Sequence, residues 1–338
     1  MTQIRKPGNP MSLLYKRLAD VGFNRPFIKK IVLPEWWEDE IANTPAGYSQ
    51  GVGLVARHLG LDVRTLYADA GDLAYYDLGP KRFKKNLKLS EGELTLAVCL
   101  AMRVAEIAGY ATPIPITDPP ASAQELRKAL LLRNPACVNL ESLVDYCWEC
   151  GIPVLHISQF PSKAKKMQGL VVRIEGRPVI VLSDNHKSPA WIAFLLAHEI
   201  GHVGRGHLHD SEPHVDEDIV KQADTHEEEE ANAYAVELLT GTINIKHNDN
   251  AKPTAAHIAT VATTQGKAQQ IDPGALVLRY GKTSGNWSGA MTALKSIEND
   301  PDGAAIIRTR MMKELDAECL PEESREFLYR MTGASTAE

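Results

Sequence analysis

Five consecutive residues of the chain have the types and the spacing of a divalent-metal site. They are His198, Glu199, Ile200, Gly201 and His202. Residues four positions apart lie on one face of an α-helix, so the two histidines can direct their imidazoles at the same ion. Glu199 lies one position further around the helix, where its carboxylate can act as a general base toward a water molecule at the metal. The pattern predicts a hydrolytic metal site; two core histidines beside a surface glutamate are the alternative.

The residues around this pentapeptide predict the helix that it requires. Ser188 is a favourable N-cap, and Pro189 stands at the first helical position. Gly204 and Gly206 mark the end of the segment. An apolar run between these limits comprises Trp191, Ile192, Phe194, Leu195 and Leu196. Because the apolar run precedes the metal-binding pattern directly, we expect a buried helix that carries both histidines.

A third ligand has to come from elsewhere, because hydrolytic zinc sites usually combine three protein ligands with one open position. The next well-defined helix is expected over residues 227–239, and one of its faces is apolar. Glu227 and Glu228 each fall roughly 50° from the centre of that face, whereas Glu229 and Glu230 point away from it and are interpreted as a solvated helix start. Periodicity leaves Glu227 and Glu228 as equal candidates.

Two separated motifs resemble those of the ImmA/IrrE family of metallo-endopeptidases. The first is the His-Glu-x-x-His pentapeptide at 198–202, and the second is the segment 228–239, which reads Glu-Glu-Glu-Ala-Asn-Ala-Tyr-Ala-Val-Glu-Leu-Leu. The second family motif is Glu-x-x-Ala-Asn-x-Phe-Ala followed by two leucines, and Tyr234 stands here in place of the Phe. The resemblance covers residues 121–245 and is specific because two distant motifs agree.

The resemblance implies the rest of the site and the activity. Glu228 becomes the third ligand of a Zn²⁺ ion, and Asn232, one helical turn later, becomes a residue that orients a ligand histidine. Glu199 becomes the general base of a zinc-dependent endopeptidase. The substrate that the family resemblance implies is a helix-turn-helix transcriptional repressor, whose cleavage derepresses stress-response, mobile-element or defence genes.

The predicted fold class is α+β: a zincin-like peptidase domain with a small antiparallel sheet and an active-site helix, flanked by N- and C-terminal all-α modules. Strands are expected over 154–158, 170–174 and 178–182, and helices after the site over 255–270, 273–279, 288–299, 303–314 and 322–331. The expected parts are an N-terminal tail (1–33), a helical module (34–111), a Pro-rich linker (112–120), the zinc metallopeptidase domain (121–245) and a C-terminal helical module (246–338).

The composition of the chain limits the cellular compartments and the classes of partner that are expected. The chain has 338 residues and a formal net charge of -6, so the molecule as a whole is not a polycation built for nucleic acid or anionic lipid. Its 5 cysteines are too few and too scattered for a disulfide framework. Neither a signal peptide nor a membrane-spanning run is evident, so a cytoplasmic location and no membrane partner are expected.

Two features of the helical module suggest a different class of function. Residues 49–66 resemble a helix-turn-helix of the phage-repressor kind, although the second helix offers Arg64 beside Asp62 and Asp69. A basic cluster follows, which is a candidate nucleic-acid or regulatory patch: Lys81, Arg82, Lys84, Lys85 and Lys88. A plain helical bundle and a solvated basic turn are the simpler interpretations. The alternative function is a DNA-binding or regulatory interaction protein with a structural zinc helix; a third hypothesis is a protease activated by nucleic acid.

Further metal-ligating and nucleophilic residues lie outside the two motifs. A loop is expected in the polar segment after the helix. Its histidines and an aspartate are interpreted as solvated, with a second metal site or an alternative third ligand as the other possibilities: His207, His209, Asp210 and His214. Cys147 and Cys150 form a lone Cys-x-x-Cys pair, for which ordinary packing is preferred to structural zinc. Cys137 is a candidate latency thiol that would occupy the open zinc position.

Overall fold

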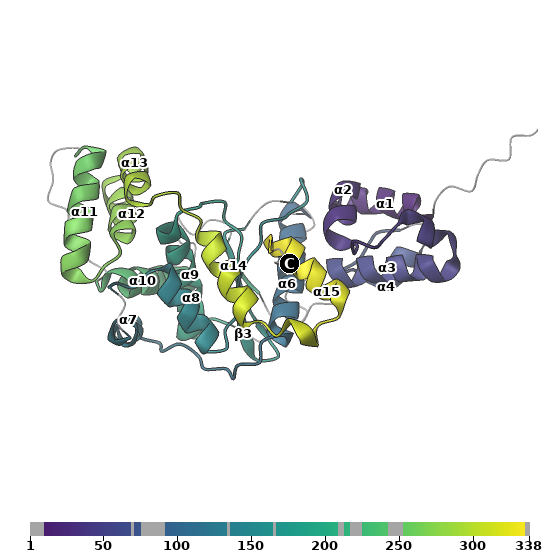
Figure 1. Ribbon diagram of the computed structural model, residues 1–338, viewed down its shortest axis with the longest axis horizontal. Helices are drawn as coiled ribbons and strands as arrows, with labels where there is room; N and C mark the ends of the chain where they lie inside the picture. The colour runs from purple at the N-terminus through teal and green to yellow at the C-terminus, as the bar shows by residue number, and fades with distance from the viewer. Residues whose placement is uncertain are drawn as a thin grey trace, which may run out of the picture. The chain divides into compact units, whose positions relative to one another are not determined.

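A computed structural model describes residues 10–68, 71–75, 92–133, 136–164, 167–208, 213–216, 225–242 and 253–334, without the side chains of 92–95. The chain divides into two compact units, shown by their elements in Figure 1. The first unit comprises residues 1–111, 157–167 and 316–338, and the second comprises 112–156 and 168–315. The described helices include none that is long and apolar enough to cross a membrane.

The named elements of the first unit, within its described part, are all helices or helical turns. Its elements are α1 (Pro10–Asp20), α2 (Arg25–Phe27), a π-helical turn (Ile28–Val32), a 3-10 turn (Asp39–Asn43), α3 (Pro45–Leu59), α4 (Val63–Tyr67), α6 (Gly92–Tyr110), a second 3-10 turn (Ala317–Cys319) and α15 (Glu322–Thr332). His58 on α3 stacks on Phe327 of α15 with ring centroids 4.7 Å apart, and its Nδ1 donates to the carbonyl of Val32 at 2.6 Å. These contacts join the C-terminal helix to the N-terminal ones.

The second unit combines helices with one four-stranded sheet. Its helices are α7 (Ala123–Leu132), α8 (Leu140–Glu149), α9 (Pro189–Arg205), α10 (His226–Thr240), α11 (Ala255–Gln269), α12 (Pro273–Ser284), α13 (Trp287–Ile297) and α14 (Gly303–Glu314). Helix α9 packs against α10, α8 and α12 and against the sheet, whereas α11, α12 and α13 pack against one another (Figure 1). The α+β class that the sequence predicts is confirmed.

The sheet has the order β1-β3-β2-β4, and its strands are β1 (Val154–His156), β2 (Gly169–Ile174), β3 (Arg177–Leu182) and β4 (His214–Asp216). Strands β2 and β3 form the predicted antiparallel hairpin, whose loop residues Glu175 and Gly176 both have positive φ, as a tight turn between twisted strands requires. Strand β1 runs parallel to β3, so the sheet is mixed rather than antiparallel. Strand β4, which pairs antiparallel with β2 at the edge, lies in a segment for which the sequence predicts a loop.

The division into units differs from the expected one in three places. The expected tail 1–33 contains α1 and α2. The Pro-rich segment 112–120 packs on the second unit, where Thr117 donates to the carbonyl of Cys150 and Arg177 donates to the carbonyl of Ile114. Residues 246–338 do not form one module, because α14 packs on α8, β1 and α9 while α15 packs in the first unit.

Candidate metal centre

Helix α9 is fixed at its start and buried along most of its length. The hydroxyl of Ser188 accepts a hydrogen bond from the backbone N–H of Trp191 at 3.1 Å, as an N-cap does. Oε1 of Glu298, just after α13, accepts from that hydroxyl at 2.9 Å and from the N–H of Ala190 at 3.0 Å. Gly206 ends the helix with φ 76°, in the left-handed region. The metal-binding pattern therefore lies on a rigid element.

Close contact between α9 and α10 places the second motif beside the first. A Cβ atom at Gly201 would lie 3.1 Å from Cα of Ala231 and 3.2 Å from Cβ of Tyr234, so a larger residue would push the two helices apart by a few tenths of an ångström. The N-cap Thr225 accepts from the N–H of Glu228 at 3.3 Å and holds the first turn of α10. Glu228 therefore points at the histidines of α9.

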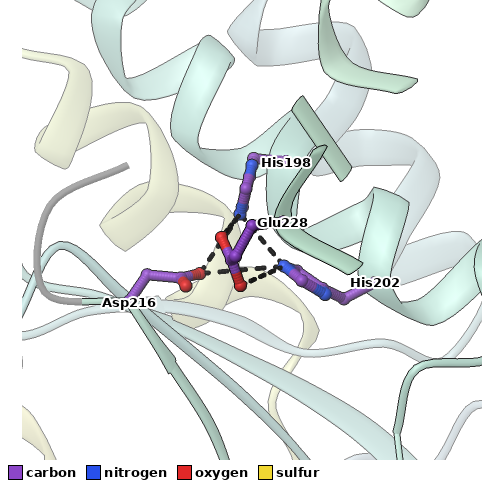
Figure 2. A group of neighbouring side chains, drawn as sticks. All are labelled: His198, His202, Asp216 and Glu228. Carbon is purple, nitrogen blue, oxygen red and sulfur yellow. Dashed lines mark hydrogen bonds and ion pairs between the residues drawn. The ribbon is translucent and has the colours of Figure 1, made fainter. Parts of the chain in front are cut away.

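Four side chains converge on one point: His198 and His202 from α9, Asp216 from β4 and Glu228 from α10 (Figure 2). One ligand atom from each lies within 4.8 Å of the others. The two Nε2 atoms are 3.0 Å apart, and Nε2 of His198 is 3.3 Å from both Oδ2 of Asp216 and Oε2 of Glu228. Nε2 of His202 is 3.6 Å from Oε1 of Glu228 and 4.0 Å from Oδ2 of Asp216.

Glu199 lies beside this cluster and is fully buried, as are His198 and His202. Its carboxylate occupies the place where a side chain on the first residue of β2 would be: a Cβ at Gly169 would lie 1.7 Å from Oε1 of Glu199. Both carboxylate oxygens of Glu199 are buried without a hydrogen-bond partner in the described part of the chain. The arrangement suits a group that exchanges protons with a bound molecule.

The electrostatics of the cluster favour a cation. Burial by itself lowers the pKa of His198, but the carboxylates of Asp216 and Glu228 outweigh it and raise that pKa to about 9. Burial and the neighbouring imidazoles lower the pKa of His202 to about 2. Burial, followed by the charges of Asp216 and Glu228, raises the pKa of Glu199 well above its usual range. The carboxylates thus demand positive charge at their centre, and an imidazole and carboxylate donor set fits a divalent ion such as Zn²⁺.

His207 and Glu230 form a chain behind His202. Nδ1 of His202 lies 3.0 Å from Nδ1 of His207, and Nε2 of His207 lies 3.1 Å from Oε2 of Glu230. When Nε2 of His202 faces a metal, its Nδ1–H donates to His207, which in turn donates to Glu230. Asn232, the residue that the resemblance assigns to this role, is half-buried, and no hydrogen bond joins its side chain to either imidazole among the described residues.

His207 and His214, the two described histidines of this segment, are engaged by neighbouring side chains, contrary to the sequence interpretation that they are solvated. His207 is only 8% exposed, and His214 donates from Nε2 to Oε1 of Glu228 at 2.6 Å. Both lie around the four clustered donors, since the ring of His214 also packs on the ring of His202 with centroids 3.8 Å apart. Glu230 is likewise engaged rather than solvated. Glu227, which periodicity leaves open beside Glu228, is outside the donor set.

The remaining candidates are placed elsewhere or not described. Cys137 lies near Arg127 and Asp272, where burial raises the pKa of its thiol to about 11, and it is not part of the donor cluster. Cys147 is buried and Cys150 half-buried, and both are free. Several candidates fall outside the described residues: His209, Asp210, Lys81, Arg82, Lys84, Lys85 and Lys88.

Asp216 is the functional residue that sequence reasoning missed. It ends a three-residue strand in the described part of a polar segment, and it is placed beside the site because it pairs with Gly169 of β2. An acidic residue in an acidic loop carries no periodic signal. The nearby histidines were the only indication that this segment could approach the metal-binding helix.

A His-Glu-x-x-His helix packed on a small mixed sheet, with a carboxylate from the next helix, defines the zincin-like class of peptidase folds. Residues 149–261 match the family model of the IrrE N-terminal-like domain, a peptidase family, which confirms the resemblance found from the two motifs. None of the curated proteins compared with the chain matches it significantly. The chain therefore carries a peptidase-family domain with a group of residues able to hold a metal ion.

Proposed function

We propose that the chain is a zinc-dependent endopeptidase that cleaves a helix-turn-helix repressor. The observation that carries the proposal is the convergence of His198, His202 and Glu228 from two separate helices, with Glu199 buried beside them. Core histidines in a structural role would hydrogen-bond to backbone or water rather than face each other and two carboxylates. The family match supplies the peptidase chemistry, while zinc and the substrate are the proposed parts.

The roles of the side chains follow from their positions. His198, His202 and Glu228 hold the metal, and His207 with Glu230 orients His202. Bound Zn²⁺ supplies a Lewis acid that polarises the scissile carbonyl and activates water. Glu199 takes the proton of the attacking water and delivers it to the leaving amine.

A peptide substrate is consistent with the sheet. Strand β4, which carries Asp216, is at the edge of the sheet formed by the described strands, where an extended peptide could add by backbone pairing. The choice of a repressor as substrate rests on the family resemblance. Activation by nucleic acid through the basic cluster 81–88 is a further part of the proposal that rests on sequence only.

The test is incubation of the zinc-loaded full chain with the purified repressor encoded beside its gene, with and without single-stranded DNA. Glu199→Gln is expected to bind one zinc as the wild type does and to lose cleavage by about 10²–10⁴-fold. Glu229→Gln makes the same charge change on an exposed neighbour of the site and is expected to leave cleavage intact. Undiminished cleavage by Glu199→Gln would refute the mechanism. Zinc binding without cleavage of the repressor in either arm would refute the substrate.

A regulatory DNA-binding protein with a structural zinc is the second candidate, because four protein donors surround the metal position. The helix-turn-helix resemblance gives it little support, since α4 has only 5 residues and Arg64 is paired with Asp62 at 2.6 Å. Salt-dependent binding of the full chain to duplex DNA, unaffected by Glu199→Gln, would favour this candidate.

A further inference from the structure

Four residues each offer one ligand atom to the same point, and these atoms lie within 4.8 Å of one another. With zinc–ligand bonds of about 2.0–2.2 Å, tetrahedral donors are about 3.3–3.6 Å apart. The five separations at His198 and His202 are 3.0, 3.3, 3.3, 3.6 and 4.0 Å. Two of these distances involve Asp216. Its Oδ2 atom is as far from Nε2 of His198, 3.3 Å, as Oε2 of Glu228 is. Four protein donors in this geometry leave no open position on a tetrahedral ion.

Asp216 is held at this position by its backbone. Its carbonyl accepts from the N–H of Gln168 at 2.7 Å, and it pairs with Gly169 across β2 and β4. Gly169 is also the residue whose missing side chain makes room for Glu199. Gly169 therefore positions both the carboxylate of Asp216, through backbone pairing, and the carboxylate of Glu199, through the space that it leaves.

The described contacts of the Asp216 side chain include those with the histidines of the site. The residue is 6% exposed, and its buried Oδ2 atom lies 3.3 Å from Nε2 of His198 and 4.0 Å from Nε2 of His202, while its Oδ1 atom lies 3.9 Å from Nε2 of His214. The Oδ2 atom points toward the imidazoles of His198 and His202 (Figure 2). A buried carboxylate is costly unless positive charge lies beside it, and a metal ion held by the same two imidazoles would supply that charge.

We infer that Asp216 is a fourth protein ligand of the metal and closes the site. This inference rests on the proposed metal site and adds to it that the described arrangement is latent. Catalysis needs the fourth position for water, so it requires that Asp216 leave the metal. Among the described residues, release of Asp216 breaks the pairing of the three-residue strand β4 with β2 and the hydrogen bond from the N–H of Gln168 to the Asp216 carbonyl.

The test is spectroscopic and does not depend on cleavage. The full chain is loaded with Co²⁺, whose visible absorption reports coordination, and titrated with acetohydroxamate, which binds only where a position is open. The wild type is expected to keep its spectrum over the titration. Asp216→Ala is expected to change its spectrum and to bind acetohydroxamate at least tenfold more tightly, while its affinity for Co²⁺ falls by about tenfold or more. Glu229→Gln, with the same loss of charge at an exposed position, is expected to behave as the wild type.

Several outcomes overturn the inference. Acetohydroxamate binding by the wild type as tight as by Asp216→Ala shows that the fourth position is already open. An opened site in Glu228→Ala but not in Asp216→Ala shows that the two carboxylates have the opposite roles. If Asp216→Ala does not fold, the wild-type titration still decides, and Asp216→Asn keeps the shape of the side chain with a weaker donor.

The same measurements distinguish failure of the proposed metal site from failure of the inference about Asp216. A wild type that binds neither Co²⁺ nor Zn²⁺ at one ion per chain, or that binds equally well after His198→Ala, refutes the metal site itself. A wild type that binds one ion through His198 and also binds acetohydroxamate refutes only the closure by Asp216.

Discussion

Gly169→Ala tests whether β2 shapes the site around Glu199. The added Cβ would lie 1.7 Å from Oε1, 2.8 Å from Cδ and 3.3 Å from Cγ of Glu199. Ordinary contact needs about 3.5 Å, so the carboxylate has to move by about 1.8 Å. Misplacement of a catalytic group by about 1 Å costs about 10²-fold in rate. Because Glu199 is fully buried, overpacking is also expected to cost about 1–3 kcal/mol of stability.

The assay is a double-mutant cycle in denaturant unfolding. Gly169→Ala is measured in the wild type and in a Glu199→Ala background, where the clashing carboxylate is absent. We expect most of the destabilisation to disappear in that background. Gly53→Ala, which has no atom within 4 Å of the added Cβ, is the control and should not destabilise. Equal destabilisation by Gly169→Ala in both backgrounds would show that the clash is not with Glu199.

Two further predictions concern His207, which orients a metal ligand, and the buried His58. His207→Ala removes the partner of Nδ1 of His202 and should weaken zinc binding about 10–100-fold in competition with a chromophoric chelator; unchanged affinity would contradict the orienting role. Burial, opposed by the Val32 carbonyl, lowers the pKa of His58 from 6.5 to about 4. Since the unfolded chain then binds the proton first, about 3 kcal/mol of stability is lost as the pH falls from about 6.5 to about 4. In His58→Gln the free energy of unfolding should no longer lose this amount as the pH falls from about 6.5 to about 4. A pH dependence equal to that of the wild type would contradict the role of His58.

Local patterns in the sequence were sufficient for much of the fold and part of the site. Ser188, Pro189 and Gly206 predicted the bounds of α9, and the apolar run predicted its burial. The helix over 303–314 and the hairpin at Glu175 and Gly176 are also found where expected. These features depend on interactions within a few residues, so periodicity and turn chemistry suffice for them.

Features that depend on distant contacts were not predictable in this way. Strands β1 and β3 are neighbours in the sheet, although β2 lies between them along the chain. Nothing in the sequence of either strand specifies this partner. The membership of α14 in the second unit and of α15 in the first is decided by which apolar faces meet. The solvated interpretation of His207 failed for the same reason, because its burial comes from contacts with His202 and Glu230.

The same distinction between local pattern and distant contact applies to the residues of the site. The sequence by itself determined His198, Glu199 and His202, because helical spacing alone puts two imidazoles on one face with a carboxylate beside them. It narrowed the next ligand to two glutamates, and the paired motif indicated Glu228. Asp216 lies beside the two histidines only in the folded chain, because its three-residue strand is positioned by pairing with β2. The contact of Glu199 with Gly169 likewise depends on the packing of α9 on the sheet. The ligand types are local properties of the chain, whereas an open or closed fourth position is a property of the packed sheet and helices.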